Sequence, residues 1–328
     1  MRRSIGNAGL ALALLSSATF GTSGSFASSL IAAGWTPGAA VTSRIVIASL
    51  ALTVPAVLQL RSRRVSWAAA RTIALYGLAA VAAAQLCYFN AVQHLSVAVA
   101  LLLEYSGILL VIAWGWARHG HRPRSLTLVG AAAAVAGLVL VLDLTGSRPL
   151  DVVGVLWGLG AAVGLATYFI LASEADHAVP ALVMSWGGLA VGAAALGCAA
   201  LAGVLPLHAT TADVTLLGRQ APWFIPVLGL ALIAAVIPYL AGIAAVRRLG
   251  AKLASFVGLT EVLFAVLFAW LLLGQRLDAL QLAGAALVIS GIALVRVDEM
   301  GLARTRRSAT PAADRTSAPR ESEELVPA

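Results

Sequence analysis

Two glutamates lie in stretches of the sequence that are otherwise long, uncharged and apolar. Glu104 follows the run Leu101–Leu103, and Glu261 lies within Gly258–Val262. A carboxylate near the centre of a lipid bilayer costs roughly 3 kcal/mol or more, so it usually faces a cavity or a partner. Such a group can bind a cationic or amine-bearing substrate, or take up a proton that is coupled to transport. In the alternative interpretation, each carboxyl group stays protonated and only bonds a neighbouring helix.

Other polar side chains within apolar segments are candidate substrate-binding or proton-binding groups. Arg44 lies near one end of its segment, where its guanidinium group can neutralise a glutamate or hold a substrate carboxylate through two hydrogen bonds. Alternatively, the Arg44 side chain extends to the outer membrane interface. The remaining candidates have polar groups that can line a cavity, although each can equally be an interior residue whose bonds are satisfied: Tyr88, Asn90, Tyr105, Tyr168 and Tyr239.

No set of residues predicts an enzyme, a metal site or a cofactor. The five histidines are dispersed, the two cysteines lie in apolar runs without metal-ligand spacing, and there is no phosphate-binding loop that would indicate ATP as the energy source. The net charge of +8 does not predict nucleic-acid binding, because most of it lies in short loops and in the tail. We therefore expect a small-molecule substrate and the lipid bilayer as partners, and leave proton coupling and a homodimer open.

The elements that position these residues are predicted to be membrane-spanning helices. The chain is 60% hydrophobic and 11% charged, too few charges for a soluble domain of 328 residues. Its apolar residues recur in stretches of about 20, the length that crosses a hydrocarbon core of about 30 Å as a helix. We predict an all-α polytopic membrane protein with ten spans, at about 8–30, 38–60, 72–92, 95–117, 126–143, 153–173, 181–204, 223–246, 253–274 and 279–297.

Lys and Arg residues are concentrated in alternate loops. If the N-terminus is cytoplasmic, the outer loops receive only Arg148, Arg219 and Arg276, and the inner loops and the tail receive most of the other Lys and Arg residues. This bias predicts a multi-pass protein of the cell membrane (inner or plasma membrane) with both termini in the cytoplasm. Residues 299–328 are rich in Ser, Pro, Ala and charge, which predicts a disordered cytoplasmic tail.

An internal repeat divides the membrane part into residues 1–146 and 147–298. Leu128–Ala132 of the fifth span resembles Leu282–Ala286 of the tenth, and in each span a second glycine follows the first by seven residues. Five spans per half make the second repeat inverted relative to the first, a pattern typical of secondary transporters. At 1.5 Å per residue, both glutamates then lie roughly 14 Å deep, approached from opposite sides.

These features resemble the EamA family of the drug/metabolite transporter superfamily, over about residues 8–297. The resemblance rests on Tyr88–Val92 followed by Leu101–Tyr105, on Arg247–Ser255 followed by Glu261 and Leu271–Gln275, and on both glycine motifs. It implies ten helices around a central cavity between the halves, and alternating access to that cavity. The chain departs from the family in lacking a proline near both glutamates and in having Gln275 where many members have glutamate.

Together, these observations predict a secondary-active transporter, an exporter of a small metabolite, amino-acid-like or amphipathic compound across the inner membrane, with proton coupling as an open option. The alternative is a polytopic membrane scaffold or regulator that transports nothing. A scaffold has no need for two matched carboxyl groups at mid-membrane depth. A polar cavity that contacts both glutamates favours transport, and a closed, dry core between the halves favours the scaffold.

Overall fold

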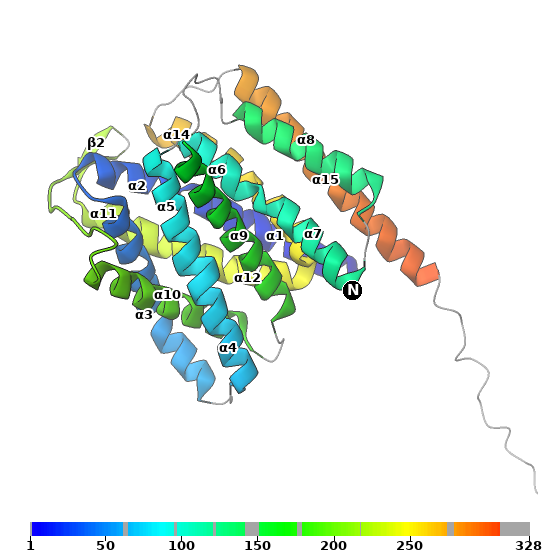
Figure 1. The fold of residues 1–328 in the computed structure, drawn as a ribbon, viewed down its shortest axis with the longest axis horizontal. Helices are drawn as coiled ribbons and strands as arrows, with labels where there is room; N and C mark the ends of the chain where they lie inside the picture. The colour runs from blue at the N-terminus through cyan, green and yellow to red at the C-terminus, as the bar shows by residue number, and fades with distance from the viewer. Residues whose placement is uncertain are drawn as a thin grey trace, which may run out of the picture.

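The computed structural model describes residues 2–61, 65–94, 97–120, 123–141, 151–175, 179–216, 218–273 and 279–308 (Figure 1). The secondary-structure elements in the described part of the first half are all helices, and one of them, η1, is π-helical. Its elements are α1 (Arg2–Gly21), α2 (Ser23–Ala32), α3 (Pro37–Leu60), α4 (Trp67–Leu75), η1 (Tyr76–Ala83), α5 (Ala84–His94), α6 (Val97–Tyr105), α7 (Gly107–His119) and α8 (Ser125–Val141).

The second half contains a second π-helical stretch, η2, and a short β-hairpin. Its elements are α9 (Val152–Glu174), α10 (Ala181–Leu201), β1 (Val214–Leu216), β2 (Arg219–Ala221), α11 (Phe224–Leu228), η2 (Gly229–Val236), α12 (Ile237–Leu249), α13 (Ala251–Gly258), α14 (Thr260–Leu273) and α15 (Ala279–Ser308).

Seven helical stretches in the described residues are long and apolar enough to cross a membrane. They correspond to the predicted spans one to four and six to eight, and the helix Ser125–Leu140 at the fifth is apolar but shorter. The ninth predicted stretch is divided between α13 and α14, and the tenth lies in α15. A multi-pass helical membrane protein is therefore confirmed, and the number of ten spans stays a prediction.

Corresponding helices of the two halves are interrupted at corresponding places. In the first half, η1 lies between α4 and α5, and α6 gives way to α7 at Ser106. In the second half, η2 lies between α11 and α12, and α13 gives way to α14 at Leu259. Glu104 lies two residues before the first break, and Glu261 lies two residues after the second. Both glutamates thus lie beside a local irregularity in helical hydrogen bonding, at which the backbone of Ser106 and of Leu259 stays in the right-handed helical region.

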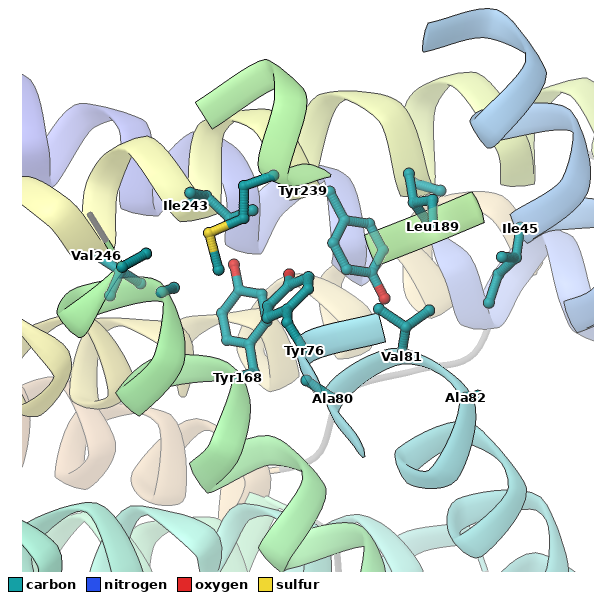
Figure 2. Close-up of a cluster of buried hydrophobic side chains, with 14 of the residues drawn as sticks. Ile45, Tyr76, Ala80, Val81, Ala82, Tyr168, Leu189, Tyr239, Ile243 and Val246 are labelled. Carbon is teal, nitrogen blue, oxygen red and sulfur yellow. The ribbon is translucent and has the colours of Figure 1, made fainter. Parts of the chain in front are cut away.

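Helices of one half pack mainly against helices of the other. The helix α1 packs against α12 and α14, α3 against α10 and η2, and α5 against α9. Buried tyrosines fill part of the resulting core: the rings of Tyr76, Tyr168 and Tyr239 lie together among helices of both halves (Figure 2). The centroids of Tyr76 and Tyr168 are 5.8 Å apart, and those of Tyr168 and Tyr239 are 6.4 Å apart.

The helices α8 and α15 run side by side along one edge of the bundle (Figure 1). The repeated glycines make this contact close. A Cβ atom at Gly130 would lie 2.9 Å from the Gly291 carbonyl oxygen, and one at Gly137 would lie 2.7 Å from the Gly284 carbonyl oxygen. The repeated glycine motif therefore joins the last helices of the two halves through near backbone contact, as small residues do between helices in lipid.

Two details of the predicted architecture need correction. The chain is not all-α, because β1 and β2 pair as an antiparallel hairpin in which Val214 faces Ala221. This hairpin follows a loop that is fixed to the turn between α2 and α3, where Trp35 Nε1 donates to the Thr210 carbonyl at 2.8 Å. The boundary predicted at residue 298 falls inside α15, which continues to Ser308. The rest of the predicted disordered tail lies outside the described residues.

Candidate functional site

Arg44 is an interior residue. It lies in α3 and is 7% exposed. Its Nη1 atom donates to Ser23 Oγ at 3.1 Å, and its Nη2 atom donates to the Ala234 carbonyl oxygen at 2.8 Å. The guanidinium carbon also lies 5.3 Å from the centre of the Phe20 ring, within the range of a cation–π contact. The guanidinium group is therefore held by α1, α2 and η2, and does not extend to the surface of the protein.

The carbonyl of Ala234 is available to Arg44 because of a proline one turn later. Pro238 has no backbone N–H, so the carbonyl four residues before it lacks its usual helical donor. That carbonyl belongs to Ala234, near the end of the π-helical segment η2. Pro238 also gives its own carbonyl to a side chain of the first half, since Ser16 Oγ donates to it at 2.9 Å. The missing N–H of Pro238 thus leaves the Ala234 carbonyl as an acceptor for the Arg44 side chain of α3.

The two glutamate carboxyl groups lie close enough to interact with each other and with Arg44. Glu104 is in the last turn of α6, and Glu261 is in the first turn of α14, where the helix dipole favours a negative charge. The Tyr105 hydroxyl group donates a hydrogen bond to the Glu261 carboxyl group. The side chains of both glutamates are partly buried.

The structure brings most of the other predicted site residues to this centre. Tyr88 interacts electrostatically with both glutamates, and Tyr239 interacts with both glutamates and with Arg44. Tyr168 interacts with Glu261 and packs edge-on against Tyr239. We call Arg44, Glu104, Glu261 and the tyrosines 88, 105, 168 and 239 the polar centre. It combines side chains from α3, α5, α6, α9, α12 and α14.

Asn90 is the predicted residue that the structure does not connect to the polar centre. Its Nδ2 atom donates to the Leu86 carbonyl oxygen at 2.7 Å, within its own helix α5. Conversely, sequence reasoning missed Phe20, Ser23 and Ala234 as partners of Arg44, and Tyr76 as a buried neighbour of Tyr168. Pro238 inside an apolar stretch was the available signal, because an interior proline leaves a carbonyl without its donor.

The polar centre contains groups that can bind the charged parts of a small molecule. Two carboxyl groups can accept from an ammonium group, and a guanidinium group can donate to a carboxylate. Among the described residues, no group of three His, Cys, Asp or Glu side chains is arranged to hold a metal ion. The arrangement brings charged and polar side chains of both halves together inside the helical bundle.

A helical membrane bundle built from two repeats is the architecture of many secondary transporters. The chain belongs to the EamA-like transporter family, which it matches over residues 7–143 and again over residues 152–297. The two matched segments coincide with the two halves described above.

Comparisons with individual proteins agree with this assignment. The chain is 25% identical over 205 residues to an uncharacterized transporter of Archaeoglobus fulgidus. The aligned region covers 62% of this chain and 69% of that protein. A solved crystal structure has the same fold, with a TM-score of 0.69 and 19% sequence identity, over 92% of this chain and 99% of the other. The protein is therefore a membrane transporter of the EamA-like family.

Proposed function

We propose that this protein is a secondary-active exporter that moves a small amine-bearing metabolite across the inner membrane by alternating access. The observation that carries the proposal is the polar centre: Glu104, Glu261 and Arg44 come from helices of both repeats and interact with one another in the interior. In an inverted-repeat transporter, rocking of one half against the other exposes such a site to each side in turn.

The charges of the polar centre favour an amine as the transported group. Two ionised carboxylates and one guanidinium group leave one uncompensated negative charge in an apolar environment, which is costly. An ammonium group or a proton removes this surplus. Exchange of a substrate ammonium on one side for a proton on the other keeps the polar centre neutral in both directions, and this exchange is proton-coupled export.

Glu261 is the residue to which we assign the main contact with the ammonium group or the proton. Its carboxyl group already accepts a hydrogen bond from Tyr105, which fixes its orientation. Glu104 and Tyr88 complete the negative side of the site, and Arg44 with Tyr239 forms the other side, where a substrate carbonyl oxygen can be bound. An amino-acid-like compound with an ammonium group and a neutral carbonyl group, such as an amide, satisfies both sides and leaves no surplus charge.

Counterflow in proteoliposomes tests this proposal without a driving force. The vesicles are loaded with one unlabelled compound at a time, from a panel of amino acids, amines, organic acids and sugars. They take up the labelled form of that compound only if it is transported. We expect exchange of compounds that carry an amine, and loss of exchange in Glu261→Gln and Arg44→Gln.

The matched control is Glu174→Gln, which makes the same substitution at a glutamate outside the polar centre. Glu174 Oε1 accepts from Trp114 Nε1 at 3.0 Å, and the glutamine amide oxygen can replace it. Exchange restricted to compounds without an amine, or unchanged exchange in both polar-centre variants, contradicts the proposed substrate class.

A further inference from the structure

An apolar cavity of about 230 Å³ lies beside the two helix breaks, between the bundle and the outer helix α8. Ser106 and Leu259, the residues at the breaks, both line it. Phe256 and Leu138 form part of its buried wall and are at most 1% exposed. Leu109 and Val135 also line the cavity and are 45% and 37% exposed. The cavity therefore opens on the outer surface of apolar helices, where a membrane protein meets lipid chains.

A cluster of charged side chains lies at one end of the same helices. Asp298 of α15 is buried and accepts a hydrogen bond from Thr127 Oγ1 at 2.5 Å. Its two carboxylate oxygens lie 3.8 Å from Arg124 Nη1 and 3.6 Å from Lys252 Nζ. Two cations thus lie beside this carboxylate. The Arg124 side chain is 48% exposed, so its charge is accessible at the surface.

The cavity and the charged cluster follow each other along the same helix faces. On α8, Ala131 of the cavity lies four residues after Thr127 of the cluster, and on α13, Phe256 lies four residues after Lys252. Residues four apart lie one above the other on a helix, separated by about 6 Å along its axis. A molecule with an anionic end and an apolar chain can therefore contact both features at once, in the groove between α8 and α13.

We propose that this groove binds one anionic glycerophospholipid of the surrounding bilayer, with its phosphate at Arg124 and Lys252 and one acyl chain in the cavity. Basic side chains between membrane helices commonly hold anionic lipid headgroups. The chain occupies a cavity whose lining is apolar apart from Tyr105 and Ser106. Because Tyr105 also binds the Glu261 carboxyl group, the acyl chain supports one wall of the polar centre from the lipid side.

The proposal concerns lipid binding and is independent of the substrate. Native mass spectrometry of the full-length protein tests it with phosphatidylglycerol and phosphatidylethanolamine that carry identical acyl chains. We expect the wild type to bind the anionic lipid more tightly than the zwitterionic one. Arg124→Gln should lower the affinity for phosphatidylglycerol by about five-fold, which corresponds to one basic residue at a membrane surface. Arg124→Lys should keep it, and the affinity for phosphatidylethanolamine should change in neither variant.

Filling the cavity mouth tests the acyl-chain site separately. Val135→Trp and Leu109→Trp alter partly exposed side chains, so both variants should fold, as checked by size-exclusion chromatography. Each should weaken the binding of both lipids. The controls are Val129→Trp, an exposed valine of α8 that does not line the cavity, and Arg118→Gln, an exposed arginine outside the cluster.

Four results overturn the proposal. The first is equal binding of the two lipids by the wild type. The second is an effect of Arg118→Gln as large as that of Arg124→Gln, because it indicates diffuse surface charge. The third is displacement of phosphatidylglycerol by millimolar glycerol 3-phosphate, because then the headgroup alone accounts for binding. The fourth is undiminished binding of phosphatidylglycerol to both tryptophan variants, because then the cavity holds no acyl chain.

Discussion

Arg44 of α3 and Ala234 of η2 are joined by a hydrogen bond of 2.8 Å from Nη2 to the carbonyl oxygen. This bond connects the first repeat to the second beside the polar centre. It exists because Pro238 removes the donor that would otherwise use the Ala234 carbonyl. A backbone irregularity in one half therefore determines where a charged side chain of the other half is held.

Arg44 and Pro238 should behave as a coupled pair in a double-mutant cycle. Arg44→Gln should lower the free energy of unfolding by about 1.5–3 kcal/mol, the usual contribution of hydrogen bonds to a charged group. Pro238→Ala supplies an N–H that can bond the Ala234 carbonyl, so the loss of Arg44 should cost less in that background. Denaturant unfolding of the four proteins in detergent measures the interaction. Effects that add within about 0.5 kcal/mol contradict the coupling.

Gly21 should be needed for the correct position of Glu261. A Cβ atom at Gly21 would lie 2.7 Å from Phe264 Cβ and 3.1 Å from the Glu261 carbonyl oxygen. Gly21→Ala should displace the first turn of α14 and lower the transport rate roughly ten-fold or more, since small misplacements at a site are costly. Gly24→Ala is the matched control, because a Cβ atom there meets nothing within 4 Å. Equal transport rates for the two variants in the counterflow assay contradict this prediction.

Gly130 should be required for the pairing of α8 with α15. Gly130→Leu places a side chain against the Gly291 backbone, and overpacking of this kind costs typically 1–3 kcal/mol. We expect a lower melting temperature in detergent. Gly197→Leu, in the interior of α10, meets nothing within 4 Å and should not lower it. If the melting temperature falls equally in both variants, the loss comes from glycine replacement in a membrane helix and not from helix pairing.

Asp151 should stabilise the protein in a pH-dependent way. Its carboxylate accepts from the Val153 N–H at 2.8 Å and lies 3.0 Å from His94 Nδ1. The backbone hydrogen bond to Val153, and next the bond with His94, lower the pKa of Asp151 below its usual value. A depressed folded-state pKa gives stability that is present above the usual aspartate pKa and is lost as the pH falls through the folded-state value.

Asp151→Ala should therefore lower the melting temperature at pH 7, and the difference from the wild type should shrink progressively as the pH is lowered below the usual aspartate range. Melting curves of both proteins at matched pH values provide the measurement. A difference that stays constant, or grows, on acidification is evidence against this linkage.

The repeat, the helical membrane character and most residues of the polar centre followed from the sequence, because they depend on composition and on spacing within helices. Glu104 and Glu261 are identifiable as charged residues in apolar runs. For Arg44 the sequence left two alternatives, a place beside the glutamates or one at the membrane interface. Burial of an arginine near a helix end depends on what packs around it, which the sequence does not show. The glycine motif was recognisable as a repeat, but the direct contact between its two copies is a property of the fold.

Other features depend on tertiary contacts that a single sequence does not reveal. The π-helical segments η1 and η2 and the breaks at Ser106 and Leu259 interrupt runs whose hydropathy is continuous. The β-hairpin is a pair of three-residue strands in the segment between the seventh and eighth predicted spans, and strands this short carry no alternating pattern. Asn90 has the right residue type for a cavity, but its bond to Leu86 within its own helix competes with any outward contact.

Uptake driven by a pH gradient in proteoliposomes tests the central claim most directly, with wild type, the double variant Glu104→Gln/Glu261→Gln, and the control Glu174→Gln. The account predicts that a compound exchanged in counterflow accumulates in response to the gradient in wild type and in the control, and that the double variant, although folded, shows no accumulation. Full accumulation by the double variant would contradict the assignment of coupling and substrate binding to the two glutamates.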